Sequence, residues 1–185
     1  MLDFNNTEIA FSAKSQSELR NAYLLFNTIK YPLLVKCAGV ASNIALRIHF
    51  PLAWAVKPTL YKQFVGGETL QDCHKIINHL MKFNVRSTLD FSAEGEQTPE
   101  GIQATFEETM RSIDFAKGND NLAYAVFKPS TITTDELLAK ASEKREELTI
   151  EEVKAFREFK ERFMAFCQRA YENDVRLLSL IHISE

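Results

Sequence analysis

The sequence has few of the residues that define disulfide-rich, metal-binding or turn-rich proteins. Its three cysteines, Cys37, Cys73 and Cys167, are far apart and odd in number, so neither a disulfide framework nor a paired-cysteine metal site is expected. We interpret all three as buried apolar side chains. The four histidines also lack the spacing of metal ligands, so no metal is predicted. Only six glycines and five prolines, against fourteen phenylalanines, disfavour an all-β sandwich.

The chain also lacks a surplus of positive charge and a long apolar run. Twenty-two Lys and Arg against 25 Asp and Glu give a net charge of −3 over 185 residues, without the basic surplus that nucleic-acid binding needs. No apolar run approaches the ~20 residues of a membrane span, and the N-terminus lacks the order of a signal peptide. We therefore expect a folded cytoplasmic protein with no nucleic-acid partner.

Two apolar helices are predicted in the first third of the chain. The segment Ser15-Gln-Ser-Glu18 has the form of a capping box and begins an amphipathic helix. An apolar stripe over 33–50 predicts a second, unusually apolar helix, which Pro51 ends. Such a helix can lie on a membrane surface, but the stripe contains only Lys36 and Arg47 as basic residues. Packing against another part of the protein is therefore favoured.

Helices and strands alternate after the pair Gly66-Gly67. Helices are predicted where threonine precedes an acidic first turn, at Thr69, Thr98, Thr133 and Thr149. Strands are predicted in three apolar or β-branched segments, 85–91, 122–127 and 175–178. This alternation builds a parallel sheet, so the predicted fold class is α/β. About 100 residues follow Val85, whereas a complete eight-stranded βα barrel takes about 250, so a barrel here is incomplete.

The candidate site residues follow the predicted strands, because function in parallel α/β folds gathers at the carboxyl ends of strands. Asp90 and Glu94 follow the first strand, and Lys128 follows the second. A lysine at such a place is costly to bury unless an anion meets it, which makes Lys128 the strongest single candidate. The alternatives are an Asp90 that caps a turn, a solvated Glu94 and a Lys128 that reaches water past the strand end.

These segments, together with the N-terminus, resemble proline dehydrogenase, the flavin enzyme that begins proline breakdown. The resemblance runs in order over roughly residues 4–178 and is carried by four segments: 4–11, 57–69, 89–95 and Phe127-Lys128. It implies an N-terminal helical arm at 1–66 and, at 67–178, the first part of an incomplete (βα)8, TIM-like barrel. It also implies FAD over the C-terminal rim, with most cofactor-binding residues in later strands than those present here.

The resemblance also implies an activity and residue roles. The full-length enzyme would oxidise L-proline to 1-pyrroline-5-carboxylate by hydride removal to FAD, with quinone as the electron acceptor. Lys128 would help to bind the substrate carboxylate, Glu94 would pair with an arginine when the site closes, and Asp90 lies on the same rim. We expect the fragment itself to be inactive. Peripheral contact of the full-length protein with the inner membrane is an alternative to a purely cytoplasmic location.

The family pattern breaks after Leu178, where the family's third strand runs into Asp-Ala-Glu. Here residues 179–185 follow instead, and we interpret them as a non-native tail. Two other functions stay open. One is a non-catalytic α/β or helical interaction module on the same scaffold. Such a module should end with a capped helix or a polar tail, whereas this chain ends inside a strand pattern, so this function is disfavoured. The other is a barrel enzyme in which Lys128 forms a Schiff base, which borohydride trapping would test.

Overall fold

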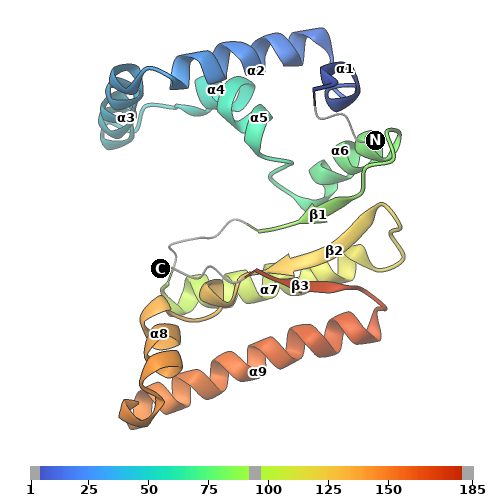
Figure 1. Ribbon diagram of the computed structural model, residues 1–185. Coiled ribbons are helices and arrows are strands. Elements are labelled where there is room, and N and C mark those ends of the chain that lie inside the picture. The colour runs from blue at the N-terminus through green and yellow to red at the C-terminus, as the bar shows by residue number, and fades with distance from the viewer. Residues whose placement is uncertain (1–4, 92–96, 181–185) are drawn as a thin grey trace. The chain divides into compact units, whose positions relative to one another are not determined.

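The computed structural model of this chain describes residues 5–91 and 97–180 (Figure 1). The chain divides into two compact units, Met1–Phe83 and Asn84–Glu185. Together they form a mixed α/β structure, mostly helical, with one small parallel sheet. The predicted arm at 1–66 and barrel part at 67–178 rest on the architecture of a family. The division into compact units does not test them, so they stay predictions.

The described part of the first unit is helical. Its elements are α1 (Thr7–Ala10), α2 (Gln16–Ile29), α3 (Pro32–Arg47), α4 (Ala53–Val56), the π-helical segment η1 (Lys57–Tyr61), α5 (Lys62–Phe64) and α6 (Leu70–Met81).

The predicted capping box begins α2. The Ser15 hydroxyl accepts the Glu18 N–H at 3.3 Å, and the Glu18 carboxylate accepts the Ser15 N–H at 2.9 Å. This backbone hydrogen bond is the main cause of a lowered pKa of the Glu18 carboxyl. A second capping box, between Thr69 and Asp72, begins α6. Both predicted helix starts are therefore confirmed, because each polar side chain satisfies a backbone group that the first helical turn leaves open.

The apolar helix α3 differs from what the sequence suggests. It covers Pro32–Arg47 instead of the predicted 33–50, so it ends before Pro51. It begins at Pro32, whose missing N–H costs nothing at the first helical position. However, none of its residues is buried. Helix α3 contacts α2, but this contact leaves the predicted apolar stripe largely open to solvent. Cys37, which lies on α3, is exposed, so its interpretation as a buried side chain is wrong.

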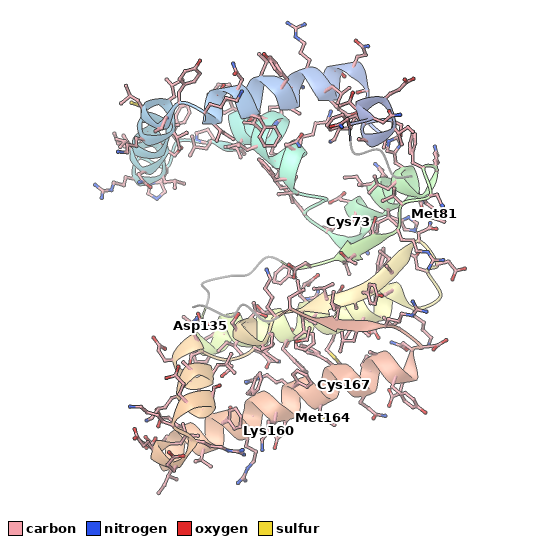
Figure 2. All side chains as sticks on the ribbon, viewed as in Figure 1. Cys73, Met81, Asp135, Lys160, Met164 and Cys167 are labelled. Atoms are coloured by element: carbon pink, nitrogen blue, oxygen red, sulfur yellow. The ribbon has the colours of Figure 1, made fainter. Side chains whose placement is uncertain are left out.

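The other two cysteines, Cys73 and Cys167, are partly buried. Cys73 lies on α6, and Cys167 lies on α9 beside the exposed Met164 (Figure 2). Burial raises the pKa of the Cys73 thiol, and the negative charge of Asp72 adds to this shift. A raised pKa leaves less of the reactive thiolate at neutral pH.

We therefore expect iodoacetamide to alkylate Cys73 several times more slowly than Cys37 at pH 7.5. Cys37 is exposed, whereas access to Cys73 is restricted and its thiolate is disfavoured. Mass spectrometry of peptides from the folded chain at successive times measures both rates. Denatured protein is the control, since both cysteines should then react at similar rates. Equal rates in the folded chain would contradict the burial of Cys73.

The second unit contains the sheet. Its strands are β1 (Ser87–Leu89), β2 (Leu122–Phe127) and β3 (Leu177–Ser179), all parallel and in the order β1-β2-β3. Its helices are α7 (Pro99–Ala116), the 3₁₀ segment η2 (Pro129–Thr131), α8 (Asp135–Glu143), the 3₁₀ segment η3 (Arg145–Glu147) and α9 (Ile150–Glu172). The parallel α/β prediction is confirmed, whereas three strands do not define a closed barrel. The predicted cap of α8 is wrong by one residue, because the Thr134 hydroxyl accepts the Leu137 N–H.

The core of this unit lies between the sheet and two long helices. Helices α7 and α9 contact each other and the sheet (Figure 1). Phe166 of α9 is fully buried, with its ring centroid 5.0 Å from that of Phe127 and 5.2 Å from that of Phe106. Large aromatic side chains of this kind bury much apolar surface. They therefore fix the sheet against α7 and α9, and with it the strand ends.

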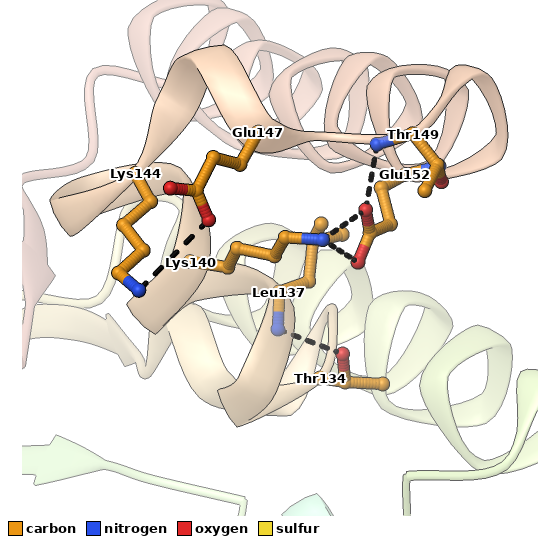
Figure 3. A network of polar contacts seen from close by, with 7 residues as sticks. All are labelled: Thr134, Leu137, Lys140, Lys144, Glu147, Thr149 and Glu152. Atoms are coloured by element: carbon orange, nitrogen blue, oxygen red, sulfur yellow. Dashed lines mark hydrogen bonds and ion pairs between the residues drawn. The ribbon is translucent and has the colours of Figure 1, made fainter.

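A polar network joins α8 to the beginning of α9 (Figure 3). The Lys140 ammonium donates to both oxygens of the Glu152 carboxylate, at 2.9 and 2.7 Å. Glu152 also accepts the Thr149 backbone N–H at 2.7 Å and so completes a capping box for α9. The hydrogen bond from Lys140, followed by that from the Thr149 backbone, lowers the pKa of the Glu152 carboxyl from 4.5.

This lowered pKa predicts a contribution to stability that acid removes. A carboxyl whose pKa is lower in the folded state stabilises the fold above its unfolded-state pKa, and the contribution disappears as pH falls through the folded-state value. We expect Glu152→Gln to lower the melting temperature at pH 7, and the difference from wild type to vanish well below pH 4.5. Thermal unfolding followed by circular dichroism measures this. Glu151→Gln, outside the network in Figure 3, is the control; an equal effect of both variants would contradict the assignment.

Candidate functional site

The sequence-predicted Lys128 lies directly after β2, at the carboxyl end of the strand. β2 is largely buried, as its continuously apolar sequence predicts. The chain then turns into η2, and the Lys128 carbonyl accepts hydrogen bonds from the Thr131 hydroxyl at 2.8 Å and the Thr131 N–H at 3.0 Å. Thr131 is itself buried. The backbone at Lys128 is therefore held on both sides, by the sheet and by this tight turn.

The structure brings Lys128 and Asp90 together. The Lys128 Nζ lies 3.1 Å from Asp90 Oδ2, and the two side chains are 10% and 35% exposed. Asp90 directly follows β1, and the parallel register of Leu89 with Ala125 places the carboxyl ends of β1 and β2 side by side. A buried ammonium without an anion would be strongly destabilised, and the Asp90 carboxylate supplies that anion.

This geometry bears differently on the alternatives for the three candidate residues. A lysine that reaches water past the strand end is not seen, because nine-tenths of the Lys128 side chain is buried. The Asp90 carboxylate pairs with Lys128, which follows the neighbouring strand, so Asp90 does more than end β1. Glu94 lies outside the described residues. The catalytic or binding roles of all three stay predictions.

Lys128 points away from the helical side of the sheet. Side chains alternate between the two faces of a strand, and Ala125 and Phe127 belong to the buried cluster with α7 and α9. Tyr124 and Lys128 therefore share the opposite face. Tyr124 and the neighbouring Leu178 of β3 are partly exposed there. The ion pair thus lies next to apolar surface, which suits a small anion with an apolar body.

The third strand covers Leu177–Ser179, so it begins two residues later and ends one residue later than the predicted 175–178. Ser179 pairs with Phe127, and the Leu180 N–H donates to the Phe127 carbonyl at 2.9 Å. By the same alternation Ser179 faces the helices and not the ion pair. Its position in β3 is not predicted, because the family pattern breaks after Leu178 and residues 179–185 are interpreted as a non-native tail.

An ammonium group has three N–H donors, so it can hold the Asp90 carboxylate and a second anion at the same time. Charge-assisted hydrogen bonds of this kind are shorter and stronger than neutral ones. No group of three or more His, Cys, Asp or Glu side chains within residues 5–91 and 97–180 is placed to hold a metal ion. The donors of the Lys128 ammonium suit carboxylate recognition at the end of a parallel sheet.

Fold and site together define a parallel α/β protein in which a buried lysine pairs with a partly exposed aspartate at the carboxyl ends of two neighbouring strands. Two mitochondrial proteins named proline dehydrogenase 1 are similar to this chain. The one from Bos taurus is 29% identical over 113 residues, and the one from Caenorhabditis elegans is 28% identical over 117 residues. The carbapenem antibiotics biosynthesis protein CarD of Pectobacterium carotovorum subsp. carotovorum is 30% identical over 81 residues.

These matches cover 60%, 62% and 44% of this chain, but only 19%, 18% and 22% of the respective relatives. The chain thus spans about a fifth of the length of the curated relatives it matches. No protein-family model matches it, and no solved structure does. The resemblance to proline dehydrogenase is confirmed by these curated relatives.

Proposed function

We propose that this chain is the opening part of a FAD-dependent proline dehydrogenase, which oxidises L-proline to 1-pyrroline-5-carboxylate and passes the electrons to quinone. The observation that carries the proposal is the buried Lys128 at the carboxyl end of β2, 3.1 Å from Asp90, in a chain whose curated relatives include proteins named proline dehydrogenase. The fragment itself is inactive in this proposal, because it spans a fifth of those relatives.

In the complete enzyme Lys128 holds the carboxylate of proline. The backbone of Lys128 is fixed by β2 on its N-terminal side and by the hydrogen bond from Thr131 on its C-terminal side. The buried ammonium therefore stays in one place. Asp90 positions the ammonium and compensates its charge before substrate arrives. Fixing the carboxylate orients the pyrrolidine ring and lowers the entropic cost of reaching the reactive geometry.

The residues present fit the substrate end of a flavin site. The lysine–aspartate pair lies beside partly exposed apolar side chains, Tyr124 and Leu178, on the sheet face away from α7 and α9. A flat apolar ring system and a small carboxylate suit this combination. FAD, when bound, supplies the acceptor for the hydride. We assign no described residue to holding the cofactor.

The same sheet face supports a barrel as the architecture of the complete protein. Parallel strands in the order β1-β2-β3, with α7 and α9 on one face only, match the βα units of such a barrel. Further strands would close the sheet and enclose the other face, where Lys128 lies. The proposed site then lies inside the carboxyl-terminal mouth of the barrel.

The experiment that tests this function uses the gene extended to encode the complete protein. We expect the purified protein to be yellow and to reduce a soluble quinone analogue only when L-proline is present. Borohydride with a carbonyl substrate is the comparison, because it traps a Schiff base at Lys128. Covalent trapping without proline-dependent quinone reduction would reject the dehydrogenase in favour of Schiff-base chemistry. A colourless protein with neither activity would favour a non-catalytic module.

A further inference from the structure

The charge of the first unit is distributed very unevenly along the sequence. Although the chain carries a net charge of −3, it has no Asp or Glu from Leu19 to Gly67. The same segment has six cations: Arg20, Lys30, Lys36, Arg47, Lys57 and Lys62. The acids that border the segment neutralise two of them, because Glu68 pairs with Lys57 at 2.6 Å and Glu18 pairs with Lys62 at 3.7 Å. Of the remaining four, Lys30 precedes α3, and Lys36 and Arg47 lie on it.

Helix α3 combines this charge with an open apolar surface. Leu33, Val40 and Ile44 lie on one side of the helix and are 73%, 61% and 55% exposed. Lys36 and Arg47, eleven residues apart, lie along a neighbouring polar stripe. A third side of α3, at Leu34, Val35 and Ala38, lines a groove of about 720 Å³ with α2 and η1. The outer apolar side and its cations thus face away from the groove.

Aromatic side chains lie near both ends of the helix. Tyr31 is the N-cap of α3, and Phe50 and Trp54 follow its last turn. All three are exposed, Trp54 by 69%. Tyrosine and tryptophan are enriched where membrane hydrocarbon meets water, because their rings are apolar and their tips polar. Apolar side chains, cations and interfacial aromatics therefore coincide on α3 and its flanks.

The dimensions favour a helix that lies on a bilayer rather than one that crosses it. α3 has 16 residues and is about 24 Å long, shorter than the ~30 Å hydrocarbon core. None of the helices in the described residues is long and apolar enough to cross alone. α2 and α3 pass that test only as a pair, and they are bent by 97° at their junction.

We propose that α3, with Tyr31, Phe50 and Trp54 at its ends, binds the surface of a bilayer that contains anionic phospholipid. Leu33, Val40 and Ile44 enter the interface, and Lys36 and Arg47 meet the phosphate and carboxylate groups of the lipids. A protein partner would account for the apolar side chains, but their combination with cations and with tyrosine and tryptophan at the two ends of the helix favours an anionic bilayer. Lipid binding itself does not depend on the proposed function. Its purpose rests on that function, because a dehydrogenase bound to the membrane surface meets its quinone there.

The test uses the chain's single tryptophan, Trp54, as an internal probe. We expect its fluorescence to shift to shorter wavelength, and the 185-residue chain to float, with vesicles of phosphatidylcholine and phosphatidylserine in equal parts. Vesicles of phosphatidylcholine alone should give neither effect, and higher ionic strength should weaken binding. Equal binding to both kinds of vesicle would overturn the role of the cations.

Two double variants separate the charge from the apolar face. K36Q/R47Q should weaken binding to the anionic vesicles about 30-fold, about fivefold per charge. L33S/I44S should weaken it by at least about 100-fold, because two large side chains no longer enter the interface. The matched controls lie on α9: K154Q/R157Q for charge, and I150S/M164S for the apolar change. Circular dichroism verifies that all four variants keep the helical content of wild type.

The outcomes also distinguish lipid from protein. If wild type binds neither kind of vesicle, and L33S/I44S abolishes self-association measured by sedimentation, a second copy covers α3 and the proposal is overturned. The proposal is also overturned if Trp54 is buried without lipid in the complete, longer protein but not in the 185-residue chain, because a later part of the protein then covers α3. Vesicle binding requires neither flavin nor proline. An intact lipid interaction in a protein without dehydrogenase activity would therefore reject the proposed function and leave this surface standing.

Discussion

Lys128→Met in the complete enzyme is expected to lower kcat/KM for L-proline by roughly 10- to 150-fold. Methionine keeps most of the apolar stem and removes the ammonium that lies 3.1 Å from Asp90. A hydrogen bond to a charged group contributes about 1.5–3 kcal/mol, and about 1.4 kcal/mol corresponds to a factor of ten. Steady-state kinetics on flavin-replete protein measures the loss, and binding of a proline analogue that retains the carboxylate should weaken by a similar factor.

The controls for this prediction separate recognition from folding. Lys154→Met, an exposed position on α9, applies the same change away from the site and should leave kcat/KM unaltered. The flavin content of Lys128→Met should also equal that of wild type, since the lysine is assigned to substrate. Unchanged kinetics and analogue affinity would make Lys128 a structural partner of Asp90 only. Loss of flavin would make it a cofactor residue.

Local patterns predicted much of the second unit. β2 is observed at Leu122–Phe127 as predicted, because a continuously apolar segment between a glycine turn and a proline leaves few alternatives. β1 is shorter than the predicted 85–91 and covers Ser87–Leu89. Its bounds depend on pairing with β2, where the register shifts between Ser87 and Thr88. Such long-range pairing leaves no trace in a single strand's sequence.

The two residues of the ion pair could be selected from the sequence, but their contact could not be predicted. Lys128 and Asp90 could be selected because each follows a strand, but their ion pair depends on the parallel register of β1 with β2. Burial was hardest to predict. An apolar stripe shows that a helix has an apolar side, but it does not show what covers that side. The exposure of Cys37 and of α3 as a whole follows from this missing information.

The second large effect is a complete loss: the 185-residue chain alone should bind no FAD and should not oxidise proline. A three-stranded sheet leaves its edges unpaired and cannot enclose a cofactor between its strand ends. Most flavin contacts are expected from later strands. Titration of FAD against the purified chain, followed by flavin fluorescence, measures binding, and a proline-dependent quinone assay measures activity. A yellow, active monomer of this chain would refute both the truncation and the barrel.

Two extensions of the chain show which part is missing. Replacing residues 179–185 with a continuation that begins Asp-Ala-Glu and completes eight strands should restore flavin binding and activity. Replacing them with Asp-Ala-Glu alone should restore neither, because the sheet would still have three strands and could not enclose a cofactor. Recovery of a flavin spectrum by the short replacement would place the cofactor site in this part of the chain. The rim around Lys128 and Asp90 would then hold the flavin rather than the substrate.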